Sequence, residues 1–174
     1  VAHAVWNGTD ALMLSGETAV GKYPVEAIKM LSQISKVAEQ NRAWQPVQLI
    51  KDLDLPHTTS KLIASSVIAA VERGGCAAVI VPTASGTTAR TIARARLPVP
   101  IIAVTDSRHT AANLKLSYGV YPVVVESFPE KWDLWTREFL SANRLKGKIA
   151  LIIQGPSLLR PTQLHRIEYL ILDN

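Results

Sequence analysis

The chain has 174 residues, of which 48% are hydrophobic and 19% charged, so it is long enough for one ordinary domain and is not disordered. Its formal net charge of +5 is modest, and the basic residues are scattered, so we expect no nucleic-acid partner. An anionic small molecule fits better, because a few cations beside backbone donors are enough to bind it.

Residues 1–41 are predicted to form the end of a helix, a strand, a turn and a second helix. Gly8 is typical of the position after a helix, and the apolar run at 10–14 predicts the strand. That strand has no sequence neighbour to pair with, so it joins the main sheet or belongs to a larger one. From Pro24, apolar residues recur at helical spacing and give one apolar face: Val25, Ile28, Leu31, Ile34 and Val37.

Residues 42–56 lose this period and contain two prolines, which predicts a linker. Residues 57–174 then alternate between helical patterns and short apolar runs. Strands this apolar, separated by helices, indicate a mostly parallel sheet of five strands within a three-layer α/β/α domain. The last two strands are joined by a short loop, so the final strand is expected to be antiparallel. The predicted helices are 57–75, 85–96, 107–119 and 129–144, and the predicted strands are 76–83, 99–105, 120–125, 147–155 and 166–173.

The first candidate site is the turn between the strand at 10–14 and the helix from Pro24. Ser15 and Glu17 could handle protons or orient a ligand, and Gly16 lets the backbone come close to it. The alternative is that Ser15, Thr18 and Glu17 cap the turn before a helix. The spacing alone leaves both interpretations open.

The second candidate site is the loop between the predicted strand 76–83 and the next helix. A buried strand followed by a helix start presents amide donors and a positive dipole end to an anion. Its hydroxyls and glycine are candidate phosphate ligands, although the motif is not a P-loop. The alternative is an N-cap, for which one hydroxyl would suffice. The candidate residues are Thr83, Ser85, Gly86, Thr87 and Thr88.

The remaining polar and aromatic features are predicted to be structural. Asp106 or Ser107 is expected to cap a helix, and the single cysteine, Cys76, to be an inert core thiol. Trp132 and Trp135 are three apart on one helix, which is typical of a packing face. The four histidines lie far apart, so no metal site is expected. No apolar run approaches the roughly 20 residues that span a bilayer, so no membrane partner is expected.

Two stretches of the sequence resemble a known family. Residues 1–34, VAHAVWNGTDALMLSGETAVGKYPVEAIKMLSQI, closely resemble the end of the catalytic barrel of pyruvate kinase. VPTASGTTARTIARARLPVPIIAVT and the following GVYPVVV are similar to its C-terminal domain. The resemblance implies a remnant of a (β/α)8 barrel at 1–41, a linker at 42–56 and the allosteric and assembly domain at 57–174.

The resemblance also implies a reaction, the glycolytic transfer of a phosphoryl group from phosphoenolpyruvate to ADP. The family uses Mg²⁺ and usually K⁺ and forms tetramers, and we expect a cytoplasmic protein. Its essential lysine, metal-binding carboxylates and substrate-binding arginine lie on earlier barrel strands. Of the catalytic rim only Ser15, and less directly Glu17, would be present, so this segment is expected to be inactive alone and to bind no metal.

The family's effector pocket maps onto Thr83, Ser85, Gly86, Thr87 and Thr88, which agrees with the candidate phosphate loop. Its other half is a glycine-rich loop, replaced here by QGPSLLRPTQLHR, in which Arg160 could meet a phosphate. We expect a sugar phosphate, or inorganic phosphate or sulfate, as the ligand. The alternatives are a free-standing phosphometabolite-binding regulatory module and a small α/β enzyme that uses Ser15 and Glu17.

Overall fold

The computed structural model describes residues 1–41, 58–155 and 165–172. The predicted linker at 42–56 lies outside these ranges. The chain divides into two compact units, Val1–Trp44 and Gln45–Asn174, and each is considered by itself. No helix among the described residues has the length and apolar character to cross a membrane.

The first unit contains three helices, α1 (Ala2–Trp6), α2 (Gly16–Ala19) and α3 (Pro24–Gln40). Gly8, at φ 81°, follows α1 as predicted, and Pro24 is the first residue of α3, where its missing N–H costs no hydrogen bond. The Trp6 Nε1 donates to the Ala38 carbonyl at 3.1 Å and joins α1 to α3. The first unit is therefore a helical hairpin of α1 and α3.

The predicted strand at 10–14 is wrong, because residues 11–14 have no regular secondary structure. A strand exists only where a neighbour completes its hydrogen bonds, and the described residues supply none to this segment. On α3, the predicted apolar face is present, but Val25, Ile28 and Val37 are each more than half exposed. Both features leave apolar surface of the first unit uncovered.

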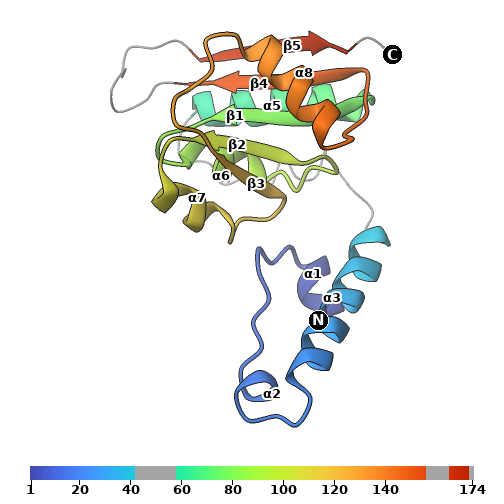
Figure 1. Cartoon of the computed structure of the whole chain (residues 1–174). Helices are drawn as coiled ribbons and strands as arrows, with labels where there is room; N and C mark the ends of the chain where they lie inside the picture. The colour runs from blue at the N-terminus through green and yellow to red at the C-terminus, as the bar shows by residue number, and fades with distance from the viewer. Residues whose placement is uncertain (42–57, 156–164, 173–174) are drawn as a thin grey trace. The chain divides into compact units, whose positions relative to one another are not determined.

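The second unit contains a five-stranded sheet in the order β3-β2-β1-β4-β5 (Figure 1). Strands β1 to β4 are parallel, and β5 is antiparallel to β4, which confirms the predicted α/β class and the orientation of the last strand. The strands are β1 (Cys76–Pro82), β2 (Ile101–Thr105), β3 (Val120–Val124), β4 (Ile149–Gln154) and β5 (Arg166–Ile171).

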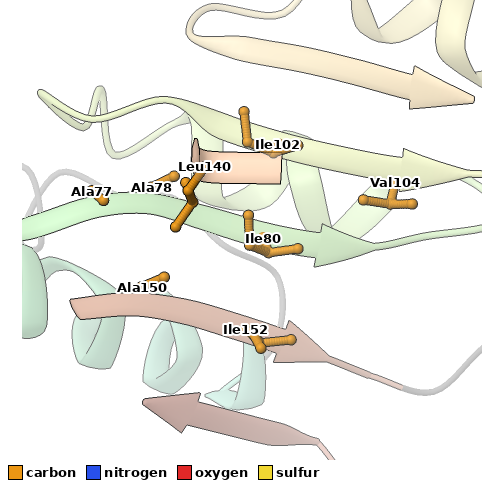
Figure 2. Close-up of a cluster of buried hydrophobic side chains, with 8 residues drawn as sticks. All are labelled: Ala77, Ala78, Ile80, Ile102, Val104, Leu140, Ala150 and Ile152. Atoms are coloured by element: carbon orange, nitrogen blue, oxygen red, sulfur yellow. The ribbon is translucent and has the colours of Figure 1, made fainter. Parts of the chain in front are cut away.

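Helices cover both faces of this sheet. Figure 1 shows α8 on one face and α5 on the other. Residues of β1, β2 and β4 bury their side chains against Leu140 of α8 (Figure 2). Trp132, Trp135 and Phe139 pack against the same cluster, and Trp135 stacks on Phe139 at 5.0 Å, which confirms a packing role. The helices of this unit are α5 (Thr58–Glu72), α6 (Thr87–Ala93), α7 (Arg108–Leu114) and α8 (Trp132–Ala142).

Candidate functional site

The strand order has one reversal, at β1. The chain runs from β1 to β2 and β3 on one side and then returns to place β4 on the other side of β1. In open α/β sheets, ligands bind at such a reversal, outside the carboxyl ends of the two strands. β1 is followed by residues 83–88, a loop and the first two residues of α6 that are together called the hydroxyl loop here, and β4 is followed by Gly155.

The hydroxyl loop begins where Thr83 ends the backbone ladder, with its amide donating to the Val104 carbonyl at 2.8 Å. The Thr83 hydroxyl is buried and accepts from the Gly86 amide at 2.9 Å. Gly86 has φ 79°, a left-handed conformation, and α6 starts at the next residue. The Thr83 hydroxyl therefore holds the amide of Gly86, the N-cap residue of α6, which has no side-chain cap of its own.

The other hydroxyls of the loop remain accessible. Ser85 and Thr87 are exposed, Thr88 is half-buried, and the Ser85 and Thr87 oxygens lie 3.0 Å apart, with either able to donate. The Thr87 amide donates to the Ser85 hydroxyl at a long 3.4 Å. Because the Ser85 and Thr87 hydroxyls are exposed and bond to each other, they can turn to a ligand at little cost.

The structure also places Arg90 at this loop and His165 next to Gly155, two side chains that the sequence had not singled out. The Arg90 Nη2 donates to the Ser85 carbonyl at 2.8 Å, and its Nη1 lies 3.0 Å from the point where a Cβ on Gly86 would be. The His165 ring lies 3.0 Å from the corresponding point on Gly155, and the Thr88 hydroxyl lies 3.8 Å from it. The residue that follows β4 therefore lies close to Thr88 of α6. Arg90 could have been suspected from its place one helical turn after Gly86, whereas His165 carried no such signal.

The other candidate residues are separate from this loop. Ser15 and Glu17 lie in the first unit, both exposed, and the Glu17 carboxylate accepts from the Ser15 amide at 3.2 Å. The Thr18 hydroxyl donates to the Ser15 carbonyl, also at 3.2 Å, but the Ser15 side chain makes no cap bond to α2. Arg160 lies outside the described residues.

The structure confirms the structural roles predicted for Ser107 and Cys76. Ser107 caps α7, with its hydroxyl accepting from the Thr110 amide at 3.1 Å. Cys76 is buried, and burial raises the pKa of its thiol, which disfavours the reactive thiolate. Within residues 1–41, 58–155 and 165–172, no three His, Cys, Asp or Glu side chains gather in a group that could hold a metal.

Fold and loop together define a doubly wound α/β domain with a polar loop at the point where the strand order reverses. The family model for the pyruvate kinase alpha/beta domain matches residues 61–158, more than half of the chain. The chain therefore belongs to the pyruvate kinase family.

Known relatives and solved structures agree with this assignment. A pyruvate kinase of Borreliella burgdorferi is 42% identical over 129 residues, 73% of this chain and 26% of that protein. One of Thermococcus litoralis is 40% identical over 75% of this chain and 29% of that protein. A crystal structure of a Cryptosporidium parvum pyruvate kinase matches 96% of this chain and 34% of its own, with a TM-score of 0.80 and 28% identity. The chain spans between a quarter and about a third of these proteins.

Proposed function

We propose that this chain provides the effector-binding and subunit-contact part of a pyruvate kinase, which transfers a phosphoryl group from phosphoenolpyruvate to ADP. Family membership supports the reaction class, and a solved structure of the Cryptosporidium parvum relative is in complex with ADP. Under this proposal the protein acts in glycolysis, in the cytoplasm, as a homo-oligomer that is a tetramer when intact.

The hydroxyl loop is the proposed effector site, and it would bind a phosphate group of a sugar phosphate, or inorganic phosphate or sulfate. The observation that carries this proposal is the surplus of polar groups at the strand-order reversal. The Thr83 hydroxyl is taken up by the Gly86 amide, which leaves the hydroxyls of Ser85 and Thr87, bonded to each other, and that of Thr88 on the first turn of α6, with Arg90 at the Ser85 carbonyl. Hydrogen bonds to a charged group contribute about 1.5–3 kcal/mol each, so three of them would hold a phosphate.

Replacing Ser85 and Thr88 together by alanine is expected to abolish most of the thermal stabilisation that phosphate or a sugar phosphate gives the chain. Two of the three accessible hydroxyls are removed, while the Thr83 hydroxyl that accepts from the Gly86 amide stays. Thermal unfolding is measured with increasing ligand, since a ligand at about 100 times its Kd stabilises by about 2.7 kcal/mol.

The matched control is Ser66→Ala with Ser141→Ala, which removes two exposed hydroxyls from α5 and α8 of the same unit. The control should respond to ligand as the wild type does. A ligand-induced shift of wild-type size in the Ser85→Ala, Thr88→Ala variant would contradict binding at this loop.

Residues 1–41 are proposed to be the end of a (β/α)8 barrel, in which 11–14 would form a strand only beside the neighbouring barrel strands, with 42–56 as the linker and 57–174 as the regulatory domain. The uncovered apolar residues of α3 and the unpaired segment 11–14 support this, because both would be completed by other barrel elements. Ser15 and Glu17 would then lie on the rim of the catalytic site.

This 174-residue polypeptide is expected to form no pyruvate from phosphoenolpyruvate and ADP. Phosphoryl transfer depends on cations positioned around the transferring group. In the part of the chain that the structure describes, no three His, Cys, Asp or Glu side chains gather in a group that could hold Mg²⁺. A coupled assay of the homogeneous chain with both metals tests this, and turnover that co-purifies with the chain would contradict it.

A further inference from the structure

Thr110 connects α7 to the hydroxyl loop. It lies near the start of α7, is only 8% exposed, and donates its hydroxyl to the Ala84 carbonyl at 2.8 Å. The two residues are 26 positions apart in the sequence. A threonine in a helix commonly bonds to a carbonyl three or four residues earlier in its own helix. The Thr110 hydroxyl instead reaches another element.

The Thr110 side chain is itself held in place. The amide of Thr110 donates to the Ser107 hydroxyl at 3.1 Å, the N-cap bond of α7. The Thr105 hydroxyl accepts from the Ser107 amide at 3.2 Å and so ties this cap to the end of β2. The position of the Thr110 hydroxyl is therefore set by β2 and α7 and not by the loop that it contacts.

Three consecutive loop residues each have a side-chain anchor. The Ala84 carbonyl is held by Thr110, the Ser85 carbonyl by Arg90, and the Gly86 amide by Thr83. Arg90 and Thr83 belong to the loop and to the helix that continues it. Of these three anchors, only Thr110 links the loop to another strand and helix, β2 and α7.

We propose that Thr110 is a positioning residue for anion binding, an inference that rests on the proposed function of the hydroxyl loop. By fixing the Ala84 peptide, Thr110 holds the next residues so that the Ser85 and Thr87 hydroxyls face a phosphate. Ala84 is exposed, so without Thr110 its carbonyl turns to water and the domain stays folded. The loop then samples more conformations in the free protein. Ligand binding must order the loop, so the affinity for the ligand falls.

The test compares Thr110→Val, which keeps the shape but removes the donor, with Thr110→Ser, which keeps the donor. Binding of inorganic phosphate is measured by titration calorimetry. Thr110→Val is expected to weaken it about tenfold, the usual effect of one hydrogen bond, and Thr110→Ser to stay within about twofold of the wild type.

Thr136 offers a matched control. It is a second fully buried helical threonine, and its hydroxyl has no hydrogen-bond partner among the residues that the structure describes. Thr136→Val should leave phosphate affinity unchanged, with an unfolding midpoint at or above that of the wild type. If Thr136→Val weakened phosphate binding as much as Thr110→Val, a specific role of Thr110 would be overturned.

Hydrogen exchange without ligand separates this inference from the proposed function. In Thr110→Val, the amides of Gly86 and Thr87 should exchange about tenfold faster, while those of β1 stay as protected as in the wild type. Unchanged exchange, or wild-type phosphate affinity, in Thr110→Val overturns the inference. A third outcome is that the wild type binds no phosphate, but the Gly86 and Thr87 amides still exchange faster in Thr110→Val. The proposed function then fails, while Thr110 still fixes the conformation of the loop.

Discussion

Gly147→Ala is expected to lower the free energy of unfolding of the second unit by about 3 kcal/mol, because there is no room for a methyl group at this position. Gly147 lies just before β4, where the chain passes close to the start of β1. A Cβ here would lie 2.6 Å from both the Ala77 amide nitrogen and the Gly75 carbonyl oxygen. Because these are backbone atoms, no change of side-chain rotamer can relieve the clash. The expected loss of stability therefore lies at the upper end of the usual range of about 1–3 kcal/mol for overpacking.

The clash also falls on hydrogen bonds that start the β1–β4 pairing. The amides of Lys148 and Ile149 both donate to the Gly75 carbonyl, at 2.6 and 3.1 Å. To admit a methyl group, β4 must move away from β1, which lengthens these bonds in the middle of the sheet. Urea unfolding followed by circular dichroism measures the change as a lower midpoint at constant slope.

Gly16→Ala is the control for Gly147→Ala. Nothing lies within 4 Å of the Cβ position on Gly16, and neither glycine has a positive φ. The control replaces glycine by alanine in α2, so it should be neutral or slightly stabilising. An equal loss of stability in both variants, or a loss below about 1 kcal/mol for Gly147→Ala, would contradict the steric argument.

The sequence predicted the second unit well because its signals are local. Apolar runs such as 76–83 and 147–155 needed only to be recognised as buried strands, and the structure gives β1 and β4 within them. The strand at 10–14 failed because pairing is not local. The same kind of apolar run forms no strand where the described chain offers no neighbour.

The candidate site shows the same limit. The hydroxyls and the glycine of the loop were visible in the sequence as a candidate site, because spacing and residue type define a turn before a helix. The role of Thr110 was not, since it depends on β2 lying beside β1 with Pro82 opposite Val104. The approach of His165 to Gly155 likewise depends on the register of β4 and β5. Predicting which residues other strands contribute to a site requires the strand order, and local sequence patterns do not contain it.

Gly86→Ala is expected to abolish phosphate binding and to lower the free energy of unfolding by about 3 kcal/mol. The left-handed conformation at φ 79° costs alanine about 1–2 kcal/mol of folding free energy relative to glycine. Its methyl group would lie 2.9 Å from the Leu114 Cδ2 and 3.0 Å from the Arg90 Nη1. Arg90 is flexible and can move, but Leu114 is fully buried, so the loop itself must shift.

Gly119→Ala separates strain from crowding. Gly119 has φ 67°, yet nothing lies within 4 Å of its Cβ position, so alanine there should cost only the conformational 1–2 kcal/mol or so. Gly119→Ala should also bind phosphate like the wild type, because it lies before β3 and away from the hydroxyl loop. Urea unfolding and phosphate titration of both variants give the comparison. If Gly86→Ala and Gly119→Ala lose the same stability, the crowding at Leu114 is relieved and the steric argument is contradicted. If Gly86→Ala binds phosphate with wild-type affinity, the hydroxyl loop is not the site. Loss of stability and loss of phosphate binding are expected together in Gly86→Ala, because Gly86 both turns the chain into α6 and brings the backbone close to Arg90. The backbone geometry that starts the helix is therefore also the geometry that would bind an anion.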